Sequence, residues 1–146
     1  MKFKSMILCQ FATDSNGLIN ILGGGITTAN AQGFPTLVPF TVVIRAAIEP
    51  TDMGVNHYSL SVRSSDGAIL TFPQPDGKKV PQLVELNANI QKNPAILPDS
   101  KEEQYINLIA QMNGFFDKAG DYQIRCDING ASYDCPLYVK GPIKAS

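Results

Sequence analysis

Residues 120–139, GDYQIRCDINGASYDCPLYV, restrict the fold of this 146-residue chain more than any other segment. Apolar residues occupy alternate positions on both sides of Asn129-Gly130, and such alternation predicts half-buried strands. Asn-Gly is the preferred two-residue turn between antiparallel strands, because both turn positions need a positive φ. The segment therefore predicts a β-hairpin with its turn at Asn129 and Gly130.

A two-residue turn determines which residues of the hairpin face each other: Ile128 with Ala131, Cys126 with Tyr133, and Ile124 with Cys135. Cys126 and Cys135 are then diagonal neighbours with Cα atoms roughly 7 to 8 Å apart, and a disulfide at that spacing requires distortion. We interpret both as buried thiols that act as small apolar residues. The third cysteine, Cys9, makes the count odd, which fits a reducing compartment.

Alternation of the same kind recurs along the chain and predicts strands at residues 3–11, 18–28, 40–48, 58–63, 68–72 and 84–91. Residues 13–17 are predicted to form a loop. Residues 101–112 fit a helix, because Ser100 and Glu103 form a possible capping box, but apolar residues in this range also alternate. We favour a strand because the range leads into the hairpin and completes an all-β sandwich. One domain over residues 1–146 is expected.

Composition and charge exclude several kinds of partner. Charged residues make up only 17% of the chain and the formal net charge is −1, and Lys78-Lys79 is the longest cationic run, so no nucleic-acid partner is expected. No apolar stretch approaches the length of a membrane span. The apolar run at residues 6–9 is also too short for an export signal. These features predict a cytoplasmic protein without a membrane partner.

Nothing in the sequence forms a catalytic, cofactor or metal motif. Gly23, Gly24 and Gly25 lack the Lys-Ser/Thr ending of a phosphate-binding loop, and we interpret them as a bulge or bend where a strand crosses between sheets. His57 is the only histidine. It is predicted to lie in a solvated loop, and one histidine with scattered cysteines cannot form a zinc site. We therefore predict a protein that is not an enzyme, with no cofactor and no metal.

Pro136 indicates where a partner would bind. Proline cannot donate to a ladder, so the last strand is predicted to lie at a sheet edge with a neighbour on one side only. Tyr138 is predicted on its outward side, and Tyr105 is the other outward tyrosine. The remaining strand tyrosines are predicted to point inward: Tyr58, Tyr122 and Tyr133. Pro136 and Tyr138 are thus the expected contact residues, although protection of the edge alone would also explain Pro136.

Two resemblances bear on the fold. The Gly-x-Tyr element at residues 120–122 resembles the corner before strand F of immunoglobulin-like domains, where a tyrosine hydroxyl contacts nearby backbone, and Tyr122 would be that residue. The succession LCQFA, INILGGG, PFTVVIRAAIEP, HYSLSVRSSDG and GDYQIRCDING resembles an uncharacterised family of small bacterial or phage-borne proteins. That resemblance implies an immunoglobulin-like antiparallel β-sandwich of about seven to eight strands, with no known activity.

The function expected from these features is a non-enzymatic protein–protein interaction or assembly module. Low charge and abundant Asn and Gln suit a sandwich that binds an unidentified protein, or a second copy, through an edge strand or a sheet face. A phage-encoded virion component, or an inhibitor of a host protein, is a narrower form of this hypothesis. A small-ligand or carbohydrate-binding module is the alternative, and it requires a cleft with outward aromatic residues.

Overall fold

The computed structural model describes residues 1–142, which contain β-strands, one short 3-10 turn at Pro50–Asp52 and no α-helix. The all-β prediction is confirmed. The strands, in order, are β1 Lys2–Cys9, β2 Phe11–Ser15, β3 Leu18–Leu22, β4 Thr28–Asn30, β5 Thr36–Ile48, β6 Gly54–Ser64, β7 Thr71–Pro73, β8 Lys79–Pro81, β9 Leu83–Ile90, β10 Gln104–Phe116, β11 Gly120–Ile128 and β12 Ala131–Lys140.

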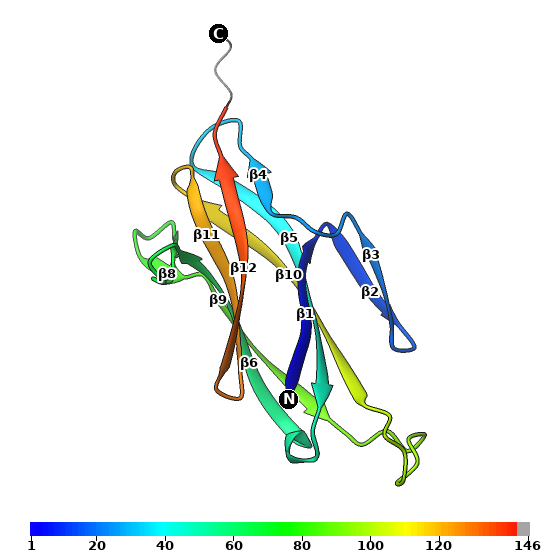
Figure 1. Ribbon diagram of the computed structural model, residues 1–146. Coiled ribbons are helices and arrows are strands. Elements are labelled where there is room, and N and C mark those ends of the chain that lie inside the picture. The colour runs from blue at the N-terminus through cyan, green and yellow to red at the C-terminus, as the bar shows by residue number, and fades with distance from the viewer. Residues whose placement is uncertain (143–146) are drawn as a thin grey trace.

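Two sheets form the body of the molecule, with the strand orders β1-β5-β10 and β4-β12-β11-β6-β9 (Figure 1). Two small hairpins, β2-β3 and β7-β8, are separate from them. Neighbouring strands are antiparallel except β4 and β12, which run parallel, so the expectation of a purely antiparallel sandwich is wrong at that pair. A short hairpin turn forces two strands to be antiparallel, but β4 follows β3 in the chain and is not joined to β12 by such a turn.

One hydrophobic core lies between the two sheets. The three-stranded sheet contributes residues such as Leu8, Ile44 and Phe116, and the five-stranded sheet contributes residues such as Leu60 and Ile124. All of these side chains are almost completely buried. Because side chains alternate between the faces of a strand, each sheet presents one apolar face to the other.

The β11-β12 hairpin has the predicted register, and its turn has the positive φ values of 49° at Asn129 and 77° at Gly130. Its cysteines are free thiols. Tyr133 lies on the inward face with Cys126 and Leu137, as predicted, but its side chain is 38% exposed. Tyr133 lies near the turn, at the end of the main core, where its ring stacks on Phe3 of β1 with centroids 3.7 Å apart.

Five other local predictions are resolved by the structure. Within the ambiguous range 101–112, residues 104–112 belong to strand β10, as favoured, and residues 101–103 precede it. His57 lies within strand β6, so its placement in a loop is wrong. The predicted 13–17 loop shrinks to a turn at Asn16-Gly17, because residues 11–15 pair with 18–22. The predicted strand 18–28 is interrupted by the glycines, and the first strand ends at Cys9.

Within residues 1–142, no helix has the length and apolar character required to cross a bilayer.

Candidate functional site

The β2-β3 hairpin is the most distinctive surface feature of the molecule. It turns at Asn16 and Gly17, with φ values of 53° and 82°, and lies to one side of the two main sheets (Figure 1). Phe11 faces Leu22 across the hairpin, and Ser15 faces Leu18. Residues on alternate positions therefore share a face, and the hairpin has two faces of different character.

The inner face packs on the outer surface of the three-stranded sheet. Ala12 and Ile19 contact a small apolar cluster there, formed by Cys9, Val43 and Ile109. This cluster is separate from the main core. An isolated two-stranded hairpin is only marginally stable in water, so this packing is what holds the hairpin in place.

Polar contacts fix the turn of the hairpin as well. The Asn107 amide of β10 donates to Asp14 Oδ2 at 2.9 Å and to the Gly17 carbonyl at 3.3 Å. Arg45 Nη1 donates to Asn107 Oδ1 at 3.3 Å, and the Arg45 guanidinium lies 4.4 Å from the centre of the Tyr105 ring. The hairpin is therefore attached at both its inner face and its turn, which makes its outer face a preorganised surface.

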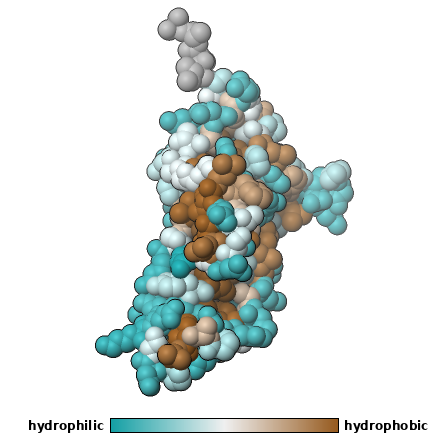
Figure 2. All heavy atoms as spheres, turned by 90° about the vertical axis from the view of Figure 1, so that its right-hand side faces the viewer, coloured by the Kyte–Doolittle hydropathy of each residue, from teal (hydrophilic) through white to brown (hydrophobic). Residues whose placement is uncertain are grey.

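The outer face is uncharged and open to solvent, and half of its residues are apolar. Phe11 is 49% exposed, Leu18 73% and Leu22 64%. The other residues on this face are small and polar, and we call the whole set the apolar hairpin face: Phe11, Thr13, Ser15, Leu18, Asn20 and Leu22. Figure 2 looks toward this side of the molecule and shows apolar surface gathered along its middle with polar residues around it. Exposed apolar surface with polar residues around it is typical of protein interaction sites.

The predicted glycine bend connects this hairpin to the main body. Gly23 and Gly25 have positive φ values of 63° and 83°, and a Cβ on Gly24 would lie 2.9 Å from Ile21 Cγ2. The amide of Gly25 donates to the Leu8 carbonyl at 2.9 Å. The three glycines thus lie where the chain crosses from the hairpin to β4 at the edge of the five-stranded sheet.

The edge at Pro136 and Tyr138 is less open than predicted. β4 pairs with β12 at Tyr138, and the Tyr138 amide donates to the Thr27 carbonyl at 2.7 Å. The prediction of a neighbour on one side only is therefore wrong at this end of β12, although it holds at Pro136, which pairs only with Gln123 of β11. The side chain of Tyr138 is 40% exposed. Tyr105 lies on the other sheet, so the two outward tyrosines do not form a joint platform.

Tyr122, Cys126 and Cys135, which the sequence also singles out, make contacts of a structural kind. The Tyr122 hydroxyl donates to the Lys118 carbonyl at 2.7 Å, the contact implied by the immunoglobulin resemblance. Burial, followed by the nearby Asp127 carboxylate, raises the pKa of Cys126 to about 12. Burial also raises the pKa of Cys135, whose thiol donates to the Met6 carbonyl. A thiol with a raised pKa is a poor nucleophile at neutral pH, so neither cysteine is placed for covalent chemistry.

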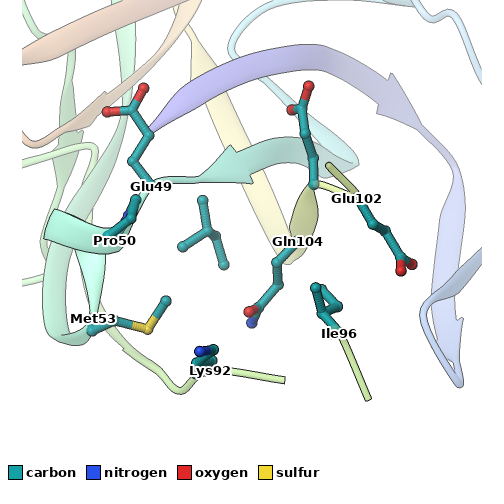
Figure 3. A pocket seen from close by; sticks show the side chains of 9 residues that line it. Glu49, Pro50, Met53, Lys92, Ile96, Glu102 and Gln104 are labelled. Carbon is teal, nitrogen blue, oxygen red and sulfur yellow. The ribbon is translucent and has the colours of Figure 1, made fainter. Parts of the chain in front are cut away.

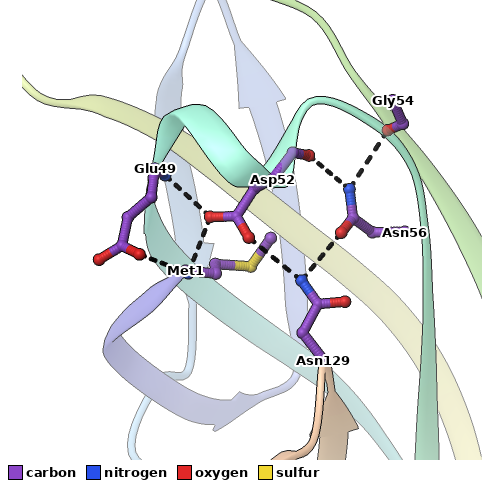
Figure 4. A network of polar contacts seen from close by, with 6 residues as sticks. All are labelled: Met1, Glu49, Asp52, Gly54, Asn56 and Asn129. Atoms are coloured by element: carbon purple, nitrogen blue, oxygen red, sulfur yellow. Dashed lines mark hydrogen bonds and ion pairs between the residues drawn. The ribbon is translucent and has the colours of Figure 1, made fainter.

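Asn129 has a second role that its turn position did not indicate. Its amide donates to Asn56 Oδ1 at 2.8 Å and to Asp52 Oδ1 at 3.2 Å (Figure 4). Asp52 is almost fully buried and also accepts from the Glu49 amide at 2.8 Å, while the ammonium group of Met1 lies 2.7 Å from its Oδ2. Burial alone would raise the pKa of Asp52, but these hydrogen bonds and the ammonium charge lower it overall. The network joins the hairpin turn to the β5-β6 connection.

A small pocket of about 360 Å³ lies beside this network, between the 49–53 and 92–104 segments. Ile48, Pro50, Met53 and Ile96 line it, and Figure 3 shows Met53 and Gln104 turned into it. The Gln104 amide is occupied, since it donates to the Gln91 carbonyl at 2.7 Å and accepts from the Asn93 amide at 3.0 Å. The pocket therefore offers mainly apolar contacts.

Residues 1–142 contain no cluster of three or more His, Cys, Asp or Glu side chains arranged to hold a metal ion. His57 is exposed and contacts Asn87 Oδ1 at 3.0 Å through Nδ1, with Glu85 Oε1 3.9 Å from its Nε2. A histidine beside a carboxylate resembles part of a catalytic triad, but within residues 1–142 the polar partners of His57 are Asn87 and Glu85, and no thiol hydrogen-bonds to it.

Comparison with known proteins places the chain in a family. Residues 4–140 match the family of unknown function DUF6941, and the chain belongs to that family. No curated protein matches it. The resemblance to an uncharacterised family is thus confirmed, and the apolar hairpin face is the surface that the geometry distinguishes.

Sequence reasoning missed the apolar hairpin face although a signal was present. Asn16-Gly17 is the same turn signal as Asn129-Gly130, and apolar residues flank it on both sides. Residues 11–12 and 21–22 are apolar at adjacent positions rather than at alternate ones. A hairpin with apolar residues on both faces cannot bury both on one sheet, which indicates an exposed apolar surface.

Proposed function

We propose that this protein is a non-enzymatic interaction module that binds a protein partner through its apolar hairpin face. The observation that carries the proposal is the exposure of Leu18, Leu22 and Phe11 on one uncharged face. Burying apolar surface is the main favourable term in most protein association. The partner is expected to present a largely uncharged apolar surface. A charge on the partner would be buried against a face that has no opposite charge to compensate for its loss of water.

The rigidity of the hairpin supports the same proposal. Its inner face is packed against Val43 and Ile109, and its turn is tied to Asn107. A surface that is already ordered loses little conformational entropy when a partner binds. Within residues 1–142, the main core contains no residue of the hairpin, and the buried contacts of the hairpin belong to the smaller cluster.

The decisive experiment compares partner capture by two variants that remove exposed leucines. Leu18→Ser with Leu22→Ser alters the apolar hairpin face, and Leu97→Ser is a matched control because Leu97 is 71% exposed but lies in the 91–103 loop. Proteins captured from the source cell by the wild type are identified, purified and titrated against each variant. We expect the double variant to weaken binding at least about tenfold and the control to bind like the wild type.

Unchanged affinity of the double variant would contradict the proposal, provided that its thermal unfolding matches the wild type. Tyr138→Ser tests the contact predicted from the sequence. Tyr138 lies in β12 of the five-stranded sheet, whereas the hairpin packs on the three-stranded sheet. Loss of binding in this variant alone would transfer the proposed contact to the β12 edge.

The narrower hypotheses carry over as proposals. We infer an immunoglobulin-like sandwich, supported by the Tyr122 hydroxyl contact and by the eight strands of the two main sheets. We infer a cytoplasmic location from three free cysteines. A phage-encoded virion component or inhibitor of a host protein is one form of the interaction hypothesis, and the identity of adjacent genes tests it.

Binding of a small apolar ligand is the second candidate function, and the pocket at Ile48, Met53 and Ile96 favours it. Its volume of about 360 Å³ lies within the usual range for ligand sites. A thermal-shift screen of small apolar compounds tests this candidate. A compound that stabilises the wild type but not Met53→Lys supports it, and a screen without such a compound contradicts it.

A further inference from the structure

Strand β10 has a long free edge. Within residues 1–142 it pairs with β5 on one side and with no strand on the other. Its 13 residues, Gln104–Phe116, include no charged residue and no proline. Native proteins usually protect such edges with charges, prolines, bulges or a covering segment, because unpaired backbone groups recruit other strands. β10 has the first two protections nowhere along its length.

The direction of the free backbone groups follows from one contact. The Phe115 amide donates to Gln82 Oε1 at 2.9 Å, and Gln82 Nε2 donates to the Phe115 carbonyl at 2.8 Å. In an antiparallel ladder, the two backbone groups of a residue point to the same side, and the side alternates along the strand. The backbone groups of Tyr105, Asn107, Ile109, Gln111 and Asn113 therefore point away from β5, toward the free edge.

The Gln82 contact also shows what kind of group this edge accepts. A side-chain amide has one carbonyl acceptor and N–H donors, like a peptide unit. At Phe115 it takes both hydrogen bonds that a neighbouring strand would take. The same two bonds are unfilled by any strand at 105–113, so the chemistry that fits the edge is that of another extended backbone.

The opposite edge of the same sheet is covered. The Leu8 carbonyl of β1 accepts from the amides of Gly25 and Ile26, both at 2.9 Å. The Met6 carbonyl accepts from the Cys135 thiol at 3.2 Å. The three-stranded sheet therefore has one covered edge and one open edge, and only the open one can be extended.

We propose that β10 is a self-association edge, where β10 of a second copy pairs antiparallel about a two-fold axis near Ile109. An antiparallel pair is self-complementary, because each residue exchanges both hydrogen bonds with its counterpart. The absence of charge in 104–116 removes like-charge repulsion between two identical edges. The dimer joins the two three-stranded sheets into one continuous sheet, and this surface is distinct from the apolar hairpin face.

Sedimentation equilibrium over a wide concentration range tests the inference on the full chain. Gln111→Pro removes an amide that points to the free edge, so it spares the ladder with β5. We expect the wild type to dimerise and this variant to raise the dimer Kd at least about tenfold. Thr28→Lys, at an exposed residue of β4, is the control and should leave the Kd unchanged.

A second variant and a second measurement keep the test independent of folding. Gln111→Lys retains the backbone and adds a charge at the edge, so it should also weaken the dimer. Hydrogen exchange of the Ile109 and Gln111 amides should slow as wild-type concentration rises. A monomeric wild type, or a folded Gln111→Pro with an unchanged Kd and no concentration-dependent protection, would overturn the inference.

The inference and the proposed function fail separately. Leu18→Ser with Leu22→Ser should leave the dimer intact if β10 is the self-association edge. A dimer that dissociates in this double variant but not in Gln111→Pro would place self-association on the apolar hairpin face and exclude the β10 edge. Loss of partner binding with retention of the dimer supports both proposals.

Discussion

Single buried polar side chains connect segments that are far apart in the sequence. Asp52 receives hydrogen bonds from the Glu49 amide and from Asn129, and Asn56 donates to the Asp52 carbonyl at 2.6 Å. A buried carboxylate of this kind is costly unless it is paired and hydrogen-bonded. Its partners here are donors or an ammonium group, so the charged form is the stable one in the folded protein.

Asp52→Asn should destabilise the protein by about 3 kcal/mol at pH 7, because it removes the charge that its buried partners require. The folded pKa of Asp52 is below its unfolded value. This stabilisation is therefore present at neutral pH and is lost as the pH falls through the folded pKa. Urea unfolding at pH 7 and at about pH 3 measures both effects.

The difference between wild type and Asp52→Asn should shrink at the lower pH. Asp121→Asn, at an exposed position, serves as the control and should change stability little at either pH. An equal destabilisation by Asp52→Asn at both values would show that lost packing, rather than the charge, is responsible.

At the scale of the strands, side chains complete hydrogen bonds where the ladders stop. Gln82, between β8 and β9, is buried and bonds to both backbone groups of Phe115 in β10. It also donates to the Thr71 carbonyl at 3.2 Å. One glutamine thus attaches the β7-β8 hairpin and the five-stranded sheet to the end of β10.

Gln82→Ala should lower the free energy of unfolding by about 2 kcal/mol, because it leaves part-buried backbone groups of Phe115 without partners. Gln82→Glu removes the N–H donors but keeps an acceptor. Comparing it with Gln82→Ala therefore measures the contribution of each of the two hydrogen bonds to stability. Gln74→Ala, at an exposed residue, is the control. Chemical denaturation measures all three, and equal stability of Gln82→Ala and wild type would contradict the role assigned to Gln82.

For the whole molecule, β5 is the strand on which both apolar clusters depend. Val42 faces the main core between the sheets, whereas Val43 faces the small cluster beneath the β2-β3 hairpin. Both are almost completely buried. Adjacent residues of one strand therefore support two different parts of the protein.

Val42→Ala and Val43→Ala should each lower the free energy of unfolding by about 2 kcal/mol, because each removes buried methyl groups. The two variants should differ in which part of the protein opens first. Val42→Ala should increase hydrogen exchange across both main sheets. Val43→Ala should increase it first in residues 11–22, because the hairpin loses its support. Identical exchange patterns in the two variants would show that the clusters open together.

Local pattern accounts for most of the strands that the sequence predicts correctly. The β11-β12 hairpin follows from alternation and an Asn-Gly turn, both of which act between near neighbours in sequence. Residues 101–112 are ambiguous in sequence because their apolar residues fit both the helical and the strand period. The strand forms because pairing with β5 buries Leu108 and Met112. The sequence places His57 in a loop because strand β6 begins at Gly54, before the region of regular apolar alternation at 58–63.

The sequence by itself determined the all-β class, the register of the last hairpin and the burial of Cys126, because turn chemistry and side-chain alternation depend only on neighbouring residues. Only the tertiary structure decided that β4 joins β12 in parallel, that the β2-β3 hairpin lies on the outside of the sheet and that β10 keeps a free edge. Each of these depends on which distant segments come together. Such pairing is set by the total surface buried across the molecule, and no single segment records it.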